Sequence, residues 1–464
     1  MEVNGKKISV IGAKRSGMAA AGLLSVKGAS VYVSELGQLS DDEKSLLSGL
    51  GVEYEDRGHT ERLCDADLAV VSPGIPRESD VVRMVLDKGI PLFSEIEAAS
   101  WFCRARMAGI TGTDGKTTTA TLLYRIAEAE GNARGYRAVS AGNIGVPFSS
   151  VVTSLAPDDL AVIELSSYQL EGCVSFHPAV SVITNITPDH LDRYHGDIRE
   201  YAEAKYRICR QQKAPDALCY NIDDPLLREH FGKGDGAYPF RLIPFGIGAD
   251  AVRYASEEGF SFDEGMILHW QGGVSYPVVA GDEFLKSSFR GRHNIYNALA
   301  ATAAALSLGI DRDAVRTALS GFTGVEHRQE LVRSLDGVDW INDSKATNVN
   351  ALLQALNAVP GRLVLIAGGR DKGNDYSILA DVVRSKVAAI IAIGESKEKI
   401  CRAFEGVTQT LPAETLEEAV ELADKAAGRG DTVLFSPGCA SFDMFSNFEE
   451  RGRLFKHIIQ GLTS

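Results

Sequence analysis

The feature of the chain that most restricts its fold is the segment Gly112-Thr113-Asp114-Gly115-Lys116-Thr117-Thr118. It follows a short apolar strand, predicted at 108–111, and opens a helix predicted to run through Ala129. Glycines allow consecutive backbone N–H groups to converge on phosphate oxygens, a lysine reaches the β- and γ-phosphates, and a threonine hydroxyl can face Mg²⁺. Ile110 stands where the strict pattern has its first glycine. The flanking strand and helix still favour a phosphate-binding loop in an α/β domain over a chance Gly-Lys-Thr turn.

The composition restricts the class of protein and its partners. The chain has 464 residues, 45% of them hydrophobic and 24% charged, which is enough for two to four globular domains of about 150 residues each. Its net charge of −14 disfavours nucleic acid and anionic membranes as partners, because both require a basic surface. The longest apolar run, at 387–393, is far shorter than the ~20 residues of a membrane helix. Seven cysteines without metal-binding spacing favour a reducing environment. We therefore expect a cytoplasmic enzyme, and a monomer.

Strands alternate with helices in three successive parts of the chain, which predicts parallel α/β sheets. We expect domains at 1–95, 96–324 and 325–464, with a linker at 321–324. Strands are predicted at 8–11, 30–33 and 68–71 in the first part, at 108–111, 160–165 and 180–183 in the second, and at 339–341, 363–367, 387–393 and 432–435 in the third. The segment 238–289, rich in glycine and aromatic residues, is predicted to form irregular antiparallel strands, and 294–308 a helix.

A second glycine turn follows the first predicted strand. The turn Gly12-Ala13-Lys14-Arg15-Ser16-Gly17 opens a helix, and Glu35 ends the next strand, as in dinucleotide-binding domains. Lys14, however, replaces the glycine that lets a pyrophosphate approach the backbone. Three interpretations stay open: an anionic nucleotide-type ligand, a purely structural turn, and NAD binding by a dehydrogenase, which Lys14 disfavours.

Three residues in the second part are candidates for metal binding. Glu164 ends an apolar strand, where a carboxylate is costly unless it is paired or bound to a metal, so it is either a Mg²⁺ ligand or is satisfied by nearby hydroxyls. His190, in the loop 187–193, could bind a metal or transfer a proton, although Mg²⁺ prefers oxygen. Lys205 lies in a helix predicted at 198–210, and a lone lysine there is normally solvated.

Three polar or glycine-rich loops follow predicted strands of the third part, at 342–348, 368–373 and 436–443. Loops at the carboxyl ends of parallel strands share one edge of the sheet, where α/β proteins bind ligands. Each loop alone could be a simple turn. Together they predict one rim of a ligand cleft.

These motifs, taken in order, resemble those of Mur ligases along essentially the whole chain. The shared residues are 112–118, Glu164 with 165–169, 185–193, Lys205, 293–294, 326–328 and 342–348. Residues 340–348, 441–443 and 447–449 look like those of the member that adds D-glutamate. The resemblance implies an α/β protein of three domains: an N-terminal Rossmann-like UDP-binding domain, a central P-loop ATPase-type domain and a C-terminal Rossmann-like domain.

The resemblance also implies an ATP-dependent amide ligase of peptidoglycan precursor synthesis. Such an enzyme adds D-glutamate to UDP-N-acetylmuramoyl-L-alanine through an acyl phosphate, uses two Mg²⁺ ions, and releases ADP and phosphate. The nearest alternative is a ligase of the same superfamily that adds a different amino acid. The chain lacks the Asp-Asn-Pro-Arg run of the diaminopimelate or lysine adders, and the α/β domain before the ATP loop disfavours folyl ligases. A NAD-dependent dehydrogenase is the alternative from another class.

Roles for individual residues follow from the same resemblance. Catalytic roles fall to Lys116, His190, a carbamylated Lys205 and Arg328. ATP would be bound by Gly112, Thr113, Asp114, Gly115, Lys116, Thr117, Thr118, Asn294, Asn297, Arg328, Asp343 and Lys345. Thr117 and Glu164 would hold one Mg²⁺ and His190 and Lys205 the other, since a carbamate offers oxygen where an amine does not. The substrates would be bound by Ser34, Glu35, Ser72, Gly74, Asn143, Ser166 and Gln169, and at the amino acid by Thr347, Lys372, Ser441 and Phe448.

Overall fold

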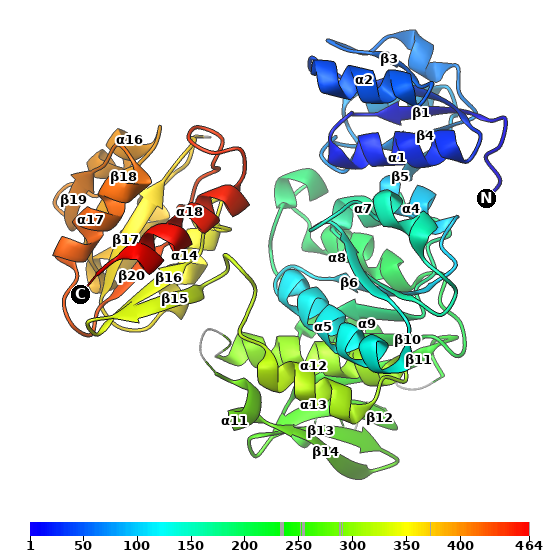
Figure 1. Cartoon of the computed structure of the whole chain (residues 1–464). Coiled ribbons are helices and arrows are strands. Elements are labelled where there is room, and N and C mark those ends of the chain that lie inside the picture. The colour runs from blue at the N-terminus through cyan, green and yellow to red at the C-terminus, as the bar shows by residue number, and fades with distance from the viewer. Residues whose placement is uncertain are drawn as a thin grey trace. The chain divides into compact units, whose positions relative to one another are not determined.

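The computed structural model describes residues 1–232, 236–250, 252, 256–286, 289, 291–371 and 373–463. The chain divides into two compact units. Unit 1 comprises Met1–Leu285 and Arg292–Phe322, and unit 2 comprises Lys286–Gly291 and Thr323–Ser464. Figure 1 shows three sheets with their helices, two of the sheets in unit 1 and one in unit 2. Each unit is described by itself.

The first sheet of unit 1 is a small parallel sheet with the order β3-β2-β1-β4-β5. Its strands are β1 (Lys7–Ile11), β2 (Ser30–Ser34), β3 (Glu53–Glu55), β4 (Leu68–Val71) and β5 (Leu92–Ser94). Its helices are α1 (Arg15–Val26), α2 (Asp41–Gly49), α3 (Asp80–Asp87) and α4 (Glu95–Ser100). Helices α1, α2 and α4 bury apolar side chains on one face of the sheet and α3 on the other. Because β1 pairs with both β2 and β4, the turns that follow these three strands meet at one edge.

The second sheet of unit 1 has nine strands in the order β14-β13-β12-β11-β10-β9-β6-β8-β7. Its strands are β6 (Arg106–Thr111), β7 (Ala138–Gly142), β8 (Leu160–Glu164), β9 (Val180–Ile183), β10 (Ala217–Asn221), β11 (Arg241–Ile247), β12 (Glu258–Asp263), β13 (Met266–Gln271) and β14 (Val274–Ala280). Helices α5 (Lys116–Arg134), α12 (Arg292–Ser307) and α13 (Arg312–Gly321) pack on one another at one face. The other helices are α6 (Phe148–Val151), α7 (Ser167–Glu171), α8 (Ile198–Tyr206), α9 (Pro225–Phe231) and α11 (Gly281–Phe284). Side chains of α6 to α9 contribute to a core cluster together with strand residues of this sheet.

The expectation for the segment 238–289 is partly wrong. Strands β11 and β12 pair in parallel, and only β13 and β14 join the sheet antiparallel. The reason lies in burial, since β11 is buried on both faces along most of its length and such a strand shows no alternation of polar and apolar residues. The parallel part of the sheet therefore extends further than the sequence pattern indicates.

Helix α4 connects the first sheet of unit 1 to the second through the side chain of Glu97. Its Glu97 side chain is buried and accepts hydrogen bonds from the backbone N–H groups of Val174, Ser175 and Phe176 at 2.9–3.0 Å, and from Trp101 Nε1 at 2.9 Å. A buried carboxylate is stable only with such a set of donors. The two sheets of unit 1 thus share a hydrogen-bonded connection as well as an apolar one.

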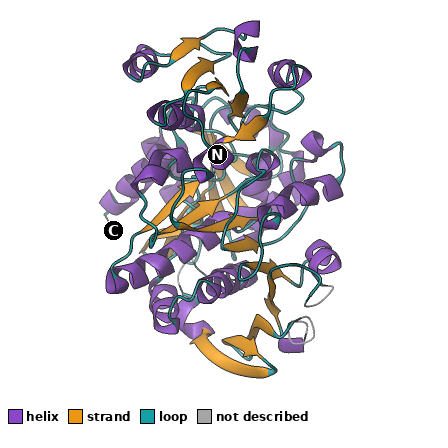
Figure 2. Ribbon diagram, turned by 90° about the vertical axis from the view of Figure 1, so that its right-hand side faces the viewer, coloured by secondary structure: helices purple, strands orange, loops and turns teal. Residues whose placement is uncertain are grey.

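Unit 2 is a doubly wound sheet with the order β15-β16-β20-β17-β18-β19. Its strands are β15 (Glu330–Leu335), β16 (Val338–Asn342), β17 (Leu363–Gly368), β18 (Val387–Ile393), β19 (Gln409–Pro412) and β20 (Thr432–Phe435), of which β15 is antiparallel. Its helices are α14 (Val349–Ala358), α15 (Ala380–Lys386), α16 (Lys397–Ala403), α17 (Leu416–Ala426) and α18 (Phe448–Gly461). Two core clusters flank the sheet, one with α14, α15 and α16 and one with α17 and α18. Figure 2 distinguishes the helices, strands and loops of the chain by colour.

The predicted α/β class with three parallel-rich sheets is confirmed. The domain bounds at 95 and 324 remain predictions, while the two compact units divide at Phe322 and Thr323. Among the described residues, no helix is long and apolar enough to cross a membrane.

Candidate active site

The loop between β6 and α5 requires its two glycines. Gly112 has a φ of 144°, and a Cβ there would lie 1.9 Å from Thr184 Oγ1. Gly115 caps α5 with a φ of 78°, and a Cβ there would lie 2.2 Å from Asn297 Oδ1. Both positions combine a left-handed backbone with a close neighbour, so only glycine fits. The loop therefore turns sharply enough to direct backbone N–H groups at the start of α5, where anions bind.

The residues after β9 hold this loop in place. Thr184 Oγ1 donates to the Asp114 carbonyl at 2.6 Å, and Asn185 Oδ1 accepts from the Asp114 N–H at 2.8 Å. Thr187 N–H donates to Thr113 Oγ1 at 3.0 Å. Sequence reasoning assigned no role to Thr184 or to Asn185. The signal that could have found them is their position directly after β9, because β9 pairs with β6 and brings its end beside the loop.

Two lysines converge on one carbonyl of the loop. Lys116 Nζ donates to the carbonyls of Gly112 and Thr113 at 2.9 and 2.6 Å, and Lys205 Nζ donates to the same Gly112 carbonyl at 2.7 Å. Lys205 is 1% exposed, and its ammonium lies 4.3 Å from the ring centre of Tyr201. Burial, and then the charge of Lys116, lower the pKa of Lys205 well below its ordinary value. The interpretation of Lys205 as a solvated side chain is therefore wrong.

Glu164 ends β8, in register with Ile110 of β6 and Gly142 of β7. Its side chain is 3% exposed and accepts a hydrogen bond from Asn143 Nδ2 at 3.0 Å. Thr117, in the first turn of α5, is also buried. A carboxylate and a hydroxyl are suitable ligands for Mg²⁺, so this donor set fits the expected ion. Lys205 fits only as an oxygen-bearing carbamate, and the environment that lowers its pKa favours the neutral amine that reacts with CO₂.

His190 begins the short 3₁₀ turn η3 (Leu191–Tyr194) with a left-handed backbone, φ 52° and ψ 27°. Its ring lies 5.3 Å from that of Tyr168, and its Nε2 lies 3.5 Å from Asp189 Oδ2. Tyr168 also lies beneath the guanidinium of Arg193, at 3.8 Å. The histidine is thus held by a ring contact while about half of its side chain is exposed.

Two of the predicted ATP-binding residues, Asn294 and Asn297, lie on α12. Asn297 Nδ2 donates to Asn294 Oδ1 at 3.0 Å, and Thr119 Oγ1 donates to Asn297 Oδ1 at 3.3 Å. Asn297 also fills the space above Gly115. It therefore supports the start of α5, whatever else it binds. Thr118, in the same turn of α5, is buried.

Four of the predicted substrate residues, Ser34, Glu35, Ser72 and Gly74, lie at the carboxyl edge of the first sheet. Glu35 Oε2 accepts from Ala13 N–H at 2.6 Å, and Ser72 Oγ donates to the Gly12 carbonyl at 3.0 Å. Ser34 Oγ donates to Glu55 at 2.5 Å. Gly74 is exposed, with open space around its Cα. These four residues meet at one edge, but the side chains of Ser34, Glu35 and Ser72 are already bonded within the protein.

Ser166 and Gln169 form a reciprocal cap at the start of α7. Gln169 N–H donates to Ser166 Oγ at 3.3 Å, and Ser166 N–H donates to Gln169 Oε1 at 2.9 Å. Such a capping box stabilises a helix start by itself. Their predicted contact with substrate remains a prediction.

Asp343 is a buried carboxylate among the predicted site residues of unit 2. It is 5% exposed, and it accepts hydrogen bonds from Ser436 Oγ at 2.7 Å and from Gln329 N–H at 3.2 Å. Burial raises its pKa to about 6, against the opposing effects of Ser436 and of Arg328. Lys345 N–H donates to the His327 carbonyl at 3.1 Å, so the strand end carrying Lys345 is joined to the segment carrying Arg328.

A buried arginine that sequence reasoning missed bonds to two of the loops that carry predicted amino-acid residues, 342–348 and 436–443. Arg451 is 1% exposed and donates to Ser344 Oγ and to the carbonyls of Ser344 and Cys439 at 2.8–3.1 Å. Ser344 Oγ donates in turn to the Phe448 carbonyl at 2.8 Å. Ser441 is buried two residues after Cys439, and Thr347 is half-buried. Lys372 lies outside the described residues.

A cluster of two glutamates and a histidine in unit 2 already has a lysine as its partner. Glu326, His327 and Glu330 lie close enough to hold a metal, but Lys456 Nζ already bonds Glu326 at 3.0 Å and Glu330 at 2.6 Å.

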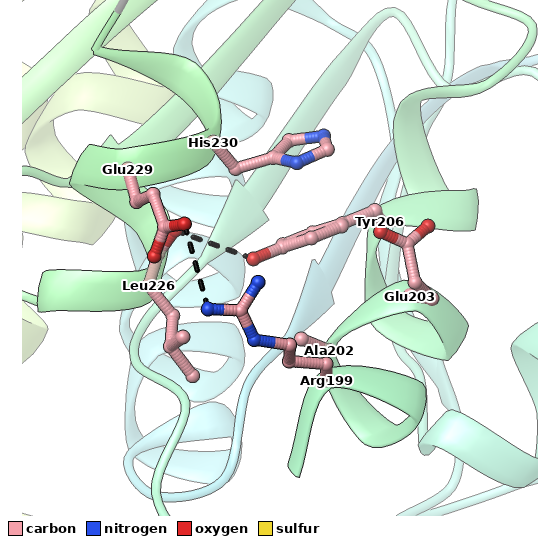
Figure 3. Close-up of a pocket in the computed structure, with 7 residues that line it drawn as sticks. All are labelled: Arg199, Ala202, Glu203, Tyr206, Leu226, Glu229 and His230. Atoms are coloured by element: carbon pink, nitrogen blue, oxygen red, sulfur yellow. Dashed lines mark hydrogen bonds and ion pairs between the residues drawn. The ribbon is translucent and has the colours of Figure 1, made fainter. Parts of the chain in front are cut away.

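A cavity of about 180 Å³ between α8 and α9 is lined by Arg199, Ala202, Glu203, Tyr206, Leu226, Glu229 and His230 (Figure 3). Its four α8 residues recur at helical spacing along that helix. None of the predicted site residues is among the described residues that line it.

The chain matches known families along most of its length. Residues 7–81 match the MurD N-terminal domain, 110–305 the Mur ligase middle domain, and 327–439 the Mur ligase, glutamate ligase domain. The chain is 66% identical over 462 residues to the UDP-N-acetylmuramoylalanine–D-glutamate ligase of Chlorobium limicola, covering 100% of this chain and 99% of the relative. It is 59% identical to the protein of the same name from Chlorobium phaeobacteroides, with both chains fully covered.

Solved structures share the fold at low sequence identity. The MurC UDP-N-acetylmuramate-alanine ligase of Thermotoga maritima aligns with a TM-score of 0.57 at 19% identity, covering 98% of this chain and 99% of that one. A pseudomurein peptide ligase type C of Methanothermus fervidus aligns with a TM-score of 0.55 at 21% identity, covering 99% and 100%. Full-length identity, three matched domains and the two-lysine loop lead to one conclusion: the chain belongs to the Mur ligase family.

Proposed function

We propose that this member of the family joins D-glutamate to UDP-N-acetylmuramoyl-L-alanine at the expense of ATP, as a step of peptidoglycan precursor synthesis. The observation that carries the proposal is the convergence of Lys116 and Lys205 on the Gly112 carbonyl, in a chain whose full-length relatives are named as D-glutamate ligases. The loop supports ATP as the phosphoryl donor. The names of the relatives support the two other substrates.

Phosphorylation comes first because a carboxylate is a poor acyl donor. The γ-phosphoryl group moves to the L-alanine carboxylate, and the loop N–H groups and Lys116 neutralise charge that would repel this nucleophile. The D-glutamate amine then attacks the acyl phosphate, loses a proton, and expels phosphate to leave the amide. Lys116 must leave the Gly112 and Thr113 carbonyls to reach ATP, which a flexible lysine side chain allows.

Two Mg²⁺ ions belong to the proposal, and each would stabilise negative charge on transferring oxygens. Thr117 and Glu164 would hold one ion, with Asn143 orienting the Glu164 carboxylate. His190 and a carbamylated Lys205 would hold the other. The buried position of Lys205 beside Lys116 supports this assignment, because an unmodified ammonium there has a cationic neighbour and little water.

Unit 2 supplies the remaining proposed contacts. Asp343 would accept hydrogen bonds from the ribose, and Arg328 and Lys345 would contact the nucleotide phosphates. Arg328 Nε is buried without a hydrogen-bond partner among the described residues, which is consistent with a donor reserved for a ligand. Thr347, Lys372, Ser441 and Phe448 would receive D-glutamate. The domain bounds 1–95, 96–324 and 325–464, a monomeric state and a cytoplasmic location are part of the same proposal, since ATP and UDP-linked precursors are cytoplasmic substrates.

The test is product formation from defined substrates. The purified protein should release ADP and phosphate only when UDP-N-acetylmuramoyl-L-alanine and D-glutamate are both present, and mass spectrometry should detect the amide. A panel of amino acids, including L-glutamate, L-lysine and diaminopimelate, should give little or no product. ATP turnover that ignores the amino acid, or a preference for another member of the panel, would contradict the proposal.

The dehydrogenase alternative has a simple control. A thermal shift with ADP and Mg²⁺, and none with NAD or NADH, is expected, because Glu35 already accepts the Ala13 N–H in the first glycine turn. A shift with NADH of similar size would favour the alternative.

A further inference from the structure

Three tyrosines connect His190 to Lys205 inside unit 1. The Tyr168 ring lies 5.3 Å from the His190 ring and 6.4 Å from the Tyr194 ring. The Tyr194 ring lies 5.2 Å from that of Tyr201, whose face lies 4.3 Å from Lys205 Nζ. We call Tyr168, Tyr194 and Tyr201 the tyrosine stack. The two residues proposed to share one ion are therefore joined through packed rings as well as through the backbone.

Arg193 and Glu171 brace this stack. The guanidinium carbon of Arg193 lies 3.8 Å from the ring centre of Tyr168, and its Nη2 lies 3.4 Å from Glu171 Oε2. Tyr194 hydroxyl donates to the other oxygen of Glu171 at 2.6 Å. The Arg193 and Glu171 side chains are only 13% and 15% exposed. A cation over an aromatic face is attracted more strongly when water is excluded, so this contact is well placed to fix the ring.

The turn that carries His190 needs such support. His190 has a left-handed backbone, which a residue other than glycine keeps only when its surroundings hold it there. The neighbouring Asp189 is partly exposed, and its Oδ2 lies 3.5 Å from His190 Nε2, so this contact stays within the loop. Arg193 and Tyr194, later in the same turn, both bond to Glu171 of α7. The brace therefore adds a polar connection between this turn and α7, beside the packing of Leu191 and Tyr194 on the core.

We propose that Arg193 is a positioning residue that, stacked on Tyr168 and paired with Glu171, sets the place of His190 relative to Lys205 and thereby the affinity for the divalent cation they share. The inference rests on the proposed function in taking these two residues as ligands of that ion. Residues that orient metal ligands typically change metal affinity about 10–100-fold when they are replaced. Lysine cannot reproduce the effect fully, because it lacks the planar group that lies flat on a ring.

The experiment compares variants of the brace with variants that spare it. Arg193→Gln and Tyr168→Leu remove the stacked pair, Arg193→Lys keeps only the charge, and Tyr168→Phe keeps the ring. Arg199→Gln is the control, because Arg199 also pairs with a glutamate, at 3.6 Å from Glu229 of α9, and this pair is not part of the brace. Mn²⁺ binding in the presence of ADP is measured by electron paramagnetic resonance, alongside the Mg²⁺ dependence of the rate and KM for ATP.

We expect Arg193→Gln and Tyr168→Leu to weaken one class of Mn²⁺ site about tenfold, the low end for an orienting residue, and to raise the Mg²⁺ concentration at half-maximal rate by a similar factor. Arg193→Lys should fall between these variants and the wild type. Tyr168→Phe and Arg199→Gln should stay within about twofold, as surface or ring-preserving changes do. KM for ATP should change less than the Mn²⁺ affinity does, because the contacts described for Arg193 are with Glu171 and Tyr168 and not with the loop 112–118.

Unchanged Mn²⁺ affinity in Arg193→Gln and Tyr168→Leu, in proteins that melt like the wild type, would overturn the inference. Should either variant fail to fold, Arg193→Lys decides, because an affinity equal to that of wild type would equally contradict the role of the stacked guanidinium. A wild-type protein that binds Mn²⁺ but makes no amide would contradict the proposed function instead. In that case the Mn²⁺ titrations still decide the role of Arg193.

Discussion

The turn after β1 and the loop after β6 have the same order of strand, glycines and helix, but among the described contacts only the first has a backbone donor taken by a carboxylate of the protein. In the turn after β1, the Glu35 carboxylate accepts the Ala13 N–H, so an anion of the protein already occupies a donor that a phosphate would use. In the loop after β6, Lys116 and Lys205 both donate to the Gly112 carbonyl. The difference teaches that glycine spacing alone does not identify a phosphate site. The charges carried by neighbouring strands and helices decide it.

Replacing a lysine in each of these two segments gives the largest expected difference. Lys116→Ala should lower the rate of amide formation on the order of 10³-fold, because the charge that stabilises the transferring phosphoryl group is lost. Lys14→Ala, at an exposed position of the first turn, should change the rate about twofold at most. Both rates are measured by coupled ADP release at saturating substrates. Equal losses would show that the two segments do not differ in this way.

Glycine replacements test the same contrast through stability. Gly112→Ala places a methyl group against Thr184 at a backbone conformation that alanine disfavours, and should cost roughly 3–5 kcal/mol of unfolding free energy. Gly74→Ala, at an exposed position of the first sheet with open space, should stay within about 0.5 kcal/mol of wild type. Urea unfolding provides the measurement. A mild effect of Gly112→Ala, or a severe one of Gly74→Ala, would contradict the fit described for the loop.

Asp343 in unit 2 is a second buried carboxylate that can be compared with Glu35 of the first turn. Its pKa is raised from 3.8 to about 6, so the folded protein binds the proton more tightly than the unfolded chain does. This stabilisation is complete below pH 3.8 and is lost as the pH rises through about 6. Relative to Asp343→Asn, the wild type should therefore lose at most ~3 kcal/mol of unfolding free energy across that range.

Urea unfolding at several pH values between these limits measures the effect. Ser436→Ala removes a hydroxyl that favours the ionised form and should move the loss to higher pH. Curves for the wild type and Asp343→Asn that run parallel would contradict the raised pKa.

The smallest expected effect concerns Glu35. Glu35→Gln keeps an oxygen facing Ala13 but removes the charge, and should cost about 1 kcal/mol, the usual size of a weakened hydrogen bond to a charged group. It should also leave KM for ATP unchanged. A tighter interaction with free phosphate in this variant would show that the carboxylate excludes anions from the turn, which would sharpen the contrast with the loop after β6.

Several buried apolar strands, short ones included, could be predicted from the sequence, whereas the polar or exposed edge strands could not. Strands β17 and β18 are continuous apolar runs, and β8 is apolar up to Glu164, as buried parallel strands are. Strands β3 and β19 contain polar residues, and β15 is largely exposed, so their sequences carry no clear period. Such edge strands are recruited by the rest of the sheet and are not specified by their own residues.

For the candidate site, the sequence predicted which loop matters but not what surrounds it. The phosphate-type loop and the carboxylate at the end of β8 were identified from local pattern. Thr184 and Asn185 act on backbone groups about 70 residues away, which no local pattern reveals. The burial of Lys205 and of Arg451 depends on packing between distant segments. From the local sequence alone, both residues would be predicted to be exposed cations.

The buried Glu97 has a consequence for the order in which the chain is made. A ribosome delivers the first sheet and α4 well before residues 174–176, whose N–H groups Glu97 requires. Until they emerge, the Glu97 carboxylate must stay hydrated, and α4 cannot close over the second sheet. Docking of the first sheet onto the second therefore cannot be completed before a segment about 80 residues downstream of Glu97 has been synthesised.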